Sequence, residues 1–467
     1  MFQPSAIGVA LSAIALTLQS AALAQDSRAQ FMSFEAAQPI LEAMSASLPA
    51  GLRAGRLDAA RWAQWLKTAD AQVRHRLDAG EEDTLTNLLR FGVTFTKEYR
   101  IDDEYFARYG ESTLVDSFAE HRAHDLIQAL AAPGTNAGFI EMRALLERHG
   151  FPLKTAADRV AAKRYLLNNM ARMHKEFLQA KEQVKSNRFQ MFQERGISLD
   201  SNLWPDYDLD LQLGRMAAQG MLKPGSVRRV AIVGPGLDFV NKQEGVDFYP
   251  PQSVQPFALL DSLLRLGLAN ANADGGAGAG AIEIHTLDIS SLVNAHLAAA
   301  RKNAAAGRSY TVQLPWLAGG RWSDEFRTQF TDYWKALGSR IGEPVAPIPV
   351  PEVLSGIETR AVRVRPAMVA CVNPVDMNIV YQVLPVAPGE RFDLIVGTNI
   401  FLYYGAFEQS LARSNIAAML NAGGYLLSND KLAEGAASGL ELVMTTDIPM
   451  TEAPVMTDSI FCYRQRH

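Results

Sequence analysis

The hydrophobic pattern of the chain changes near Pro224-Gly225-Ser226, and this change limits the possible folds more than any other feature. From about residue 28 to 220, apolar residues recur three and four positions apart, as in amphipathic helices. Beyond that point, short apolar runs alternate with helical segments, which is typical of strand-helix-strand units in a parallel sheet. We therefore expect a helical region followed by an α/β region, with the boundary between residues 200 and 222.

The clearest predicted helix begins at Thr155, which with Asp158 forms an N-terminal capping pattern. Its apolar stripe consists of Leu166, Met170, Met173 and Phe177. A second helical stripe precedes it and ends at Gly150, the kind of residue that closes a helix. The order predicts two helices packed as a hairpin.

The α/β region contains four predicted buried strands, at residues 227–233, 282–289, 392–396 and 424–428. The first two are separated by a tract of small residues, 269–280, which we expect to be a surface loop.

The first predicted strand runs into Gly234-Pro-Gly236, a turn at which a ligand can approach the backbone closely. The second ends in Asp288, where a carboxylate can accept hydrogen bonds from the hydroxyls of a nucleotide ribose. No third glycine follows, because Leu237, Asp238 and Phe239 come after Gly236 where a dinucleotide-binding turn has its third glycine. A nicotinamide-dependent oxidoreductase therefore ranks last among the candidate functions.

At this point the C-terminal half resembles the class I S-adenosylmethionine-dependent methyltransferases, and looks most like the chemotaxis-receptor type. The resemblance rests on Phe392–Tyr404, on Leu420–Leu427, on the helix start at Gln255-Pro256-Phe257, and on a final pair of strands. It implies an α/β fold with a Rossmann-like, seven-stranded methyltransferase sheet, preceded by an all-α domain. The implied domains are a signal peptide (1–24), a helical accessory domain (25–220) and a methyltransferase-like domain (221–467).

The resemblance also implies how the residues would bind S-adenosylmethionine. Gly234 and Gly236 would border its methionine part, and Asp288 would hold its ribose. Asp376 would contact the adenine amino group, and Asn399 would face the methyl donor. The sequence departs from the family pattern at Ile232, Asp238 and Gln255, and we interpret Asp238 as a substitute for the acid missing at Ile232.

No catalytic residue is assigned, because methyl transfer from a sulfonium depends mainly on alignment of donor and acceptor. The acceptor is unknown. If it is a carboxylate, as the resemblance suggests, it is already ionised at neutral pH. Candidate substrate residues are Asp247 and Tyr249, in an insertion that is either a substrate wall or an ordered loop, and Tyr403 and Tyr404, which either orient the acceptor or only pack.

The beginning of the chain has the pattern of an export signal. Residues 6–24 carry no charge and end in Ala22-Leu23-Ala24, which predicts cleavage before Gln25. The alternative is an uncleaved membrane anchor. Export would separate the protein from S-adenosylmethionine, which is made in the cytoplasm. A cytoplasmic location therefore stays open, and so does a second function, an exported non-catalytic binding or interaction protein on a degenerate methyltransferase fold.

Composition excludes several other classes. The net charge of −5 offers no positive field for a nucleic-acid backbone, so no nucleic-acid partner is expected. No later segment is apolar enough to span a membrane, and no metal site is expected. The two cysteines, Cys371 and Cys462, would lie about five strands apart in the family's sheet, so we expect both to be free thiols.

Overall fold

The computed structural model describes residues 29–53, 55–101, 117–183, 192–193, 195–238, 247–271, 281–319, 322–352, 354, 356–433, 439–452 and 456–466. The predicted signal peptide and most of the predicted loop at 269–280 lie outside these residues. Among the helices that are described, none is long and apolar enough to cross a membrane.

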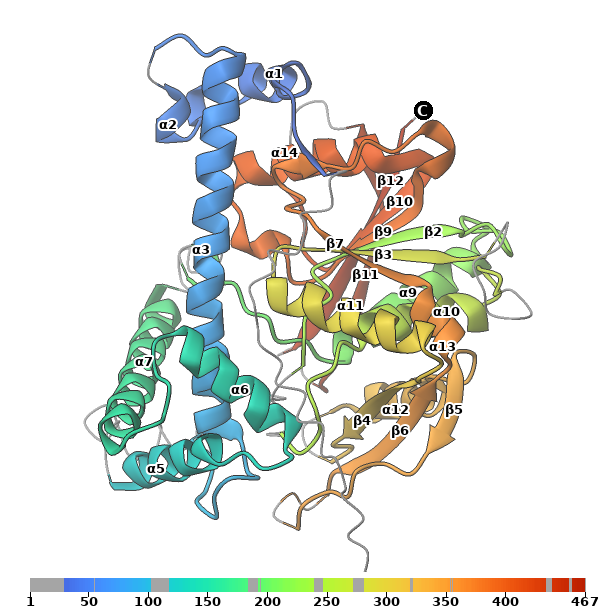
Figure 1. Ribbon diagram of the computed structural model, residues 1–467. Coiled ribbons are helices and arrows are strands. Elements are labelled where there is room, and N and C mark those ends of the chain that lie inside the picture. Colours follow the sequence, from blue (N-terminus) through green and yellow to red (C-terminus); the bar gives the residue numbers. More distant parts are fainter. Residues whose placement is uncertain are drawn as a thin grey trace, which may run out of the picture.

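The N-terminal half is built on one long helix (Figure 1). This helix, α3, has 33 residues and begins after Asp58, whose side chain accepts a hydrogen bond from the Arg61 backbone N–H. The other elements of this half are β1 (Gln30–Phe31), α1 (Phe34–Ala43), α2 (Ala50–Arg53), α3 (Ala59–Phe91), α5 (Ser117–Ala131), α6 (Ala137–Arg148), α7 (Ala156–Gln183) and α9 (Trp204–Ala218).

The predicted start of α7 is confirmed. Thr155 and Asp158 cap each other, because the Asp158 N–H donates to the Thr155 hydroxyl at 3.1 Å and the Thr155 N–H donates to the Asp158 carboxylate at 2.8 Å. The predicted hairpin is wrong. Helix α7 packs chiefly on α3 and α5, because its buried residues, such as Leu166 and Met170, belong to the core that also contains Leu85 and Leu126 of these two helices.

The C-terminal half contains a seven-stranded sheet in the order β11-β12-β10-β9-β2-β3-β7. Its strands are β2 (Arg229–Val233), β3 (Glu283–Asp288), β7 (Val372–Asp376), β9 (Phe392–Gly397), β10 (Leu420–Ser428), β11 (Leu440–Pro449) and β12 (Thr457–Gln465). The parallel strands are β2, β3, β7, β9 and β10, whereas β12 pairs antiparallel with β10 and β11. The α/β fold class and its seven-stranded sheet are confirmed, and so are the four predicted strands.

Successive residues of β2 enter two different cores, because side chains alternate between the faces of a strand. Val230 and Ile232 pack with α9 and α10 (Gln255–Arg265), whereas Ala231 and Val233 pack with α3 and α14 (Ala406–Met419). The long N-terminal helix contributes to both cores, because Leu85 and Leu88 near its end belong to the first and Trp62 and Leu66 to the second.

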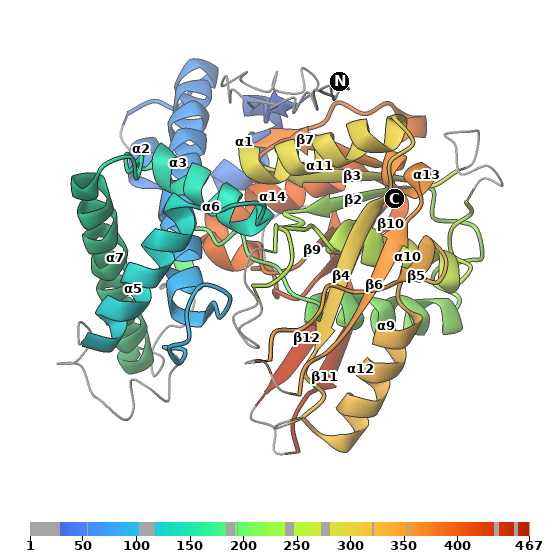
Figure 2. The same ribbon diagram turned by 60° about the horizontal axis from the view of Figure 1, so that its bottom comes forward.

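A three-stranded antiparallel sheet, which the sequence pattern did not predict, is inserted between β3 and β7 (Figure 2). It has the order β4-β6-β5 and follows the helix α11. The elements of this part are α11 (Ser291–Ala305), β4 (Tyr310–Trp316), α12 (Asp324–Ala336), β5 (Gly342–Val345), β6 (Glu358–Val364) and α13 (Pro366–Ala370). The short strand β8 (Gln382–Val383) follows β7 and pairs with β1.

The division of the chain at residue 220 stays a prediction. Helix α9, which precedes that position, packs against α10 and β12 of the sheet half. The cysteines behave as expected: Cys371 and Cys462 are both free, and the sheet order separates β7 from β12 by five strand positions.

The end of α3 depends on Arg122, a fully buried residue of α5. Its guanidinium donates to the carbonyls of Leu89, Gly92, Glu98 and Tyr99 at 2.6 to 2.9 Å. These bonds join the last turn of α3 to the segment that follows it.

We predict that Arg122→Met lowers the free energy of unfolding by about 3 kcal/mol, because it leaves buried carbonyls without donors. Urea unfolding measures the change. The matched control is Arg143→Met, which removes an exposed pair with Glu147 and should cost less than about 0.5 kcal/mol. Equal losses in the two variants would contradict the role of Arg122.

Candidate functional site at the carboxyl edge of the sheet

The glycine turn after β2 has the backbone geometry that only glycine adopts easily. Gly234 and Gly236 have φ angles of 62° and 72°. A Cβ atom on Gly234 would lie 2.2 Å from Cδ1 of Ile400, and one on Gly236 would lie 2.9 Å from Cβ of Ser201. The chain's own side chains therefore pack against the turn at the place where the sequence predicts a ligand.

A cleft of about 50 Å³ lies beside this turn, at the carboxyl ends of β2 and β3. We call it the carboxyl-edge cleft. Five of the predicted site residues line it: Gly234, Gly236, Asp288, Tyr403 and Tyr404. Cofactor pockets usually measure about 300 to 1,000 Å³, so the cleft as it stands has no room for a nucleotide.

Asp288 supplies the carboxylate of this cleft. Its side chain is 7% exposed, and it accepts a 2.7 Å hydrogen bond from the Ser290 N–H. Burial raises the pKa of this carboxyl to about 7, and the charge of Asp376 raises it further, against the opposing effect of the Ser290 hydrogen bond. A hydrogen-bond donor that entered the cleft would therefore stabilise the ionised form.

Asp376, the predicted adenine contact, is held by α3. The Arg74 guanidinium binds its carboxylate at 2.7 Å and donates at 3.2 Å to the carbonyl of Ile289, just after β3. Arg74 also pairs at 3.0 Å with Asp70, which accepts a 2.8 Å hydrogen bond from the side chain of Asn378. One turn of α3 thus joins the ends of β3 and β7.

Residues 195–201, which we call the strap, close the cleft from another side. Ile197, Ser198 and Leu199 line it, and the Leu199 carbonyl accepts a 2.8 Å hydrogen bond from Leu237, directly after the glycine turn. The Ser198 N–H donates to the Tyr403 hydroxyl at 3.2 Å.

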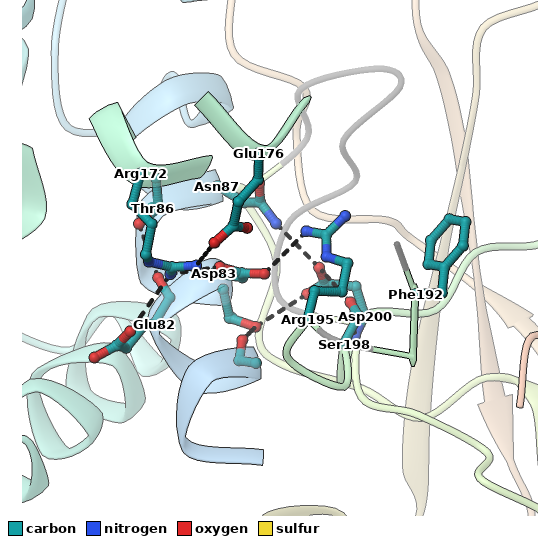
Figure 3. Close-up of polar contacts among 12 residues, drawn as sticks. Glu82, Asp83, Thr86, Asn87, Arg172, Glu176, Phe192, Arg195, Ser198 and Asp200 are labelled. Atoms are coloured by element: carbon teal, nitrogen blue, oxygen red, sulfur yellow. Dashed lines mark hydrogen bonds and ion pairs between the residues drawn. The ribbon is translucent and has the colours of Figure 1, made fainter. Parts of the chain in front are cut away.

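Polar contacts fasten the strap to α3 (Figure 3). Arg195 pairs with the buried carboxylate of Asp83 at 3.0 Å, and Asn87 donates to Asp200 at 3.2 Å. Arg76 adds hydrogen bonds to the carbonyls of Arg195 and Phe192 at 3.0 and 2.7 Å. The strap and α3 therefore form one polar assembly over the edge of the sheet.

The remaining predicted residues lie elsewhere. Asn399 is exposed, and its side-chain oxygen accepts a 2.9 Å hydrogen bond from Asn429. Asp247 is buried against the end of α3, where its carboxylate accepts hydrogen bonds from the Val93 and Thr94 N–H groups. Asp238 and Tyr249 meet in a separate small pocket.

The sequence reasoning missed Arg74 and the strap. Asp70 and Arg74 are four residues apart on a helix, a spacing that usually indicates an exposed ion pair. Nothing in the spacing of residues 195–201 connects them with the glycine turn. No group of three metal-ligating side chains occurs within the described parts of the chain.

Three buried aspartates and one half-buried aspartate indicate an unusual dependence of stability on pH. Burial raises the pKa of Asp206 to about 8, of Asp238 and Asp288 to about 7, and of Asp430 to about 6. Between pH 4 and each raised value, the folded state binds more protons than the unfolded state. The free energy of unfolding should therefore fall as the pH rises from 5 to 8, by up to about 1.4 kcal/mol per pH unit for each group.

Urea unfolding at pH 5 and pH 8 tests this sign. Asp206→Asn is neutral at both values, so this variant should lose less stability than the wild type between them. Stability that rises toward pH 8 would contradict the prediction.

No protein-family model matches the sequence, and no curated protein shows significant similarity to it. Matches among solved structures include the N-methyltransferase NodS from Bradyrhizobium japonicum WM9 in complex with S-adenosyl-L-homocysteine, at 12% identity over 62% of this chain and 99% of that chain, with a TM-score of 0.26. The methyltransferase CcbJ from Streptomyces caelestis matches at 12% identity, over 56% and 96% of the two chains, with a TM-score of 0.26. TrmN from Thermus thermophilus matches at 12% identity, over 56% and 52%, also with a TM-score of 0.26. The assignment of the fold rests on the strand order and register given above.

Proposed function

We propose that the protein is an S-adenosylmethionine-dependent methyltransferase whose cofactor binds in the carboxyl-edge cleft. The observation that carries this proposal is the meeting of the glycine turn and Asp288 in one cleft of a seven-stranded sheet. Open α/β sheets bind ligands outside the carboxyl ends of their strands. An acid at the end of the second strand is suited to the two hydroxyls of a ribose.

The residues fit the cofactor in part. Asp288 would hold the ribose, and Gly234 and Gly236 would border the methionine part. Arg74 binds Oδ1 of Asp376 at 2.7 Å, and Oδ2 of the same carboxylate would accept from an adenine amino group. The strap would have to move, since the cleft measures about 50 Å³. Binding therefore requires a rearrangement of the strap.

When bound, S-adenosylmethionine would supply a methyl group on a sulfonium leaving group. The protein would supply orientation and the exclusion of water, which account for most of what such a transfer needs. Tyr403 and Tyr404 line the cleft and would orient the acceptor. The resemblance to chemotaxis-receptor methyltransferases favours a carboxylate acceptor, which needs no general base at neutral pH.

The second candidate is a non-catalytic binding or interaction protein on the same fold. The closed cleft favours it, because the chain itself takes the room that a cofactor needs. The predicted signal at residues 1–24 fits this candidate better, because the cofactor is cytoplasmic. For this candidate we also propose that the protein is exported and that the signal is removed.

Calorimetric titration with S-adenosylmethionine and S-adenosylhomocysteine separates the two candidates. We expect micromolar binding to the wild type. Asp288→Asn should weaken it at least tenfold, because the variant loses a charged acceptor for the ribose. Asp393→Asn is the matched control, since this carboxylate accepts backbone hydrogen bonds from Arg228 and Arg229 at the opposite edge of the sheet. No heat from a folded sample would favour the non-catalytic protein.

A second prediction concerns closure by the strap. Arg195→Ala removes an ion pair that fastens the strap to Asp83, and it should tighten S-adenosylhomocysteine binding several-fold by lowering the population of the closed state. Arg172→Ala removes the second ion-pair partner of Asp83. Arg172 lies on α7, away from the strap, so this variant should leave the affinity for S-adenosylhomocysteine unchanged. Equal affinities in all three proteins would show that the strap does not limit binding.

A further inference from the structure

A second small cavity lies next to the glycine turn, and we call it the Asp238 pocket. Its space is about 20 Å³, which is enough for one group of the size of a water molecule. Ser201 and Asn202 line it, whereas the carboxyl-edge cleft contacts residues 197–199 of the same segment. The two cavities are therefore neighbours along this segment.

The carboxylate of Asp238 has one oxygen without a partner. Its Oδ2 accepts hydrogen bonds from the Tyr249 hydroxyl at 2.8 Å and from Nε2 of Gln252 at 3.3 Å. Its Oδ1 is buried and has no hydrogen-bond partner among the described residues. The residue is only 7% exposed. A buried acceptor left unsatisfied costs about 1 to 3 kcal/mol, and more when it is charged.

The side chain of Gln252 is not free to turn toward this oxygen. The backbones of Asp238 and Gln252 form a two-way bridge at 2.7 and 3.2 Å, which fixes both residues. The Gln252 amide is also committed to Gln313, because it donates to the Gln313 carbonyl and accepts from the Gln313 N–H, both at 2.8 Å. The network is thus complete except for one donor to Oδ1.

Four aromatic residues are among those that line the pocket. They are Trp204, Trp316, Tyr249 and Phe330, and the rings of Trp316 and Phe330 lie 4.3 Å apart. Aromatic faces attract cations. No ion pair joins Asp238 to a basic side chain in the described part of the protein, so its negative charge has no counter-ion among the described residues.

We propose that the Asp238 pocket binds the ammonium group of a primary amine. An ammonium has the size of the space, an N–H to donate to Oδ1, and the positive charge that a buried carboxylate lacks. Amine binding stands independently of the proposed function.

Saturation-transfer NMR with ethylammonium tests the proposal at pH 8. Two probes serve as controls: ethanol has no charge, and tetramethylammonium has the charge but no N–H and exceeds the space. We expect ethylammonium to bind with a dissociation constant in the millimolar range, the limit for so small a ligand. Ethanol and tetramethylammonium should bind at least tenfold more weakly. Equal signals from the three probes, or no signal from ethylammonium, would overturn the proposal.

Asp238→Asn keeps the shape of the side chain and removes its charge, and it should weaken ethylammonium binding at least tenfold. Asp247→Asn makes the same change at a buried carboxylate that binds the end of α3 instead, and it should leave the affinity unchanged. Melting temperatures check that both variants are folded. Retained binding in Asp238→Asn would overturn the assignment.

Tyr249→Phe provides a second test that keeps the carboxylate. Burial raises the pKa of Asp238 to about 7, with nearby Asp200 adding to it, while hydrogen bonds from Tyr249 and Gln252 oppose the rise. Loss of the Tyr249 hydroxyl should raise this pKa further, so less of the carboxyl is ionised at pH 6.5. Ethylammonium should therefore bind the variant more weakly than the wild type at pH 6.5, and the difference in affinity should shrink at pH 8. An unchanged pH profile would contradict a role for the Asp238 charge. These experiments are done without S-adenosylmethionine. A negative result would therefore overturn amine binding and leave the proposed function unaffected.

Discussion

The contact between Arg74 of α3 and the ends of β3 and β7 is the interaction on which the arrangement of this protein depends. A single guanidinium binds Asp376 and the Ile289 carbonyl, and it is held in turn by Asp70. Because charged hydrogen bonds in partly buried positions are stronger than neutral ones, this contact fixes the long helix against the sheet. The position of the strap, and with it the size of the cleft, follows from the position of α3.

The same groups that stabilise the closed arrangement would have to serve a cofactor. Ile400 lies over Gly234, and Ser201 lies over Gly236. Each of these contacts stabilises the protein in the absence of a ligand. A bound ligand would have to replace them with contacts of its own. A ligand that binds only the open arrangement must therefore supply the free energy of opening, which lowers its apparent affinity. In the first candidate function S-adenosylmethionine supplies this free energy of opening, and in the second no cofactor does.

The parallel sheet could be predicted from the sequence because its strands are buried on both faces, which gives continuous apolar runs such as residues 230–233. The glycine turn and Asp288 were predicted because they follow directly from such strands. The three-stranded sheet escaped prediction, since strands such as Tyr310–Trp316 lack a clear alternation of apolar and polar residues. Arg74 and the strap escaped for a related reason: their role is set by tertiary contacts between segments more than 100 residues apart, and a spacing pattern records only local neighbours.

Helix α3 runs without interruption for 33 residues, or about 50 Å. Along this length it binds the sheet edge through Arg74, the strap through Asp83 and Asn87, and the Asp247 carboxylate at its carboxyl end. A continuous helix bends little, so it behaves mechanically as a lever. A small tilt at one end would then displace the strap, release Asp376 and pull on Asp247 together.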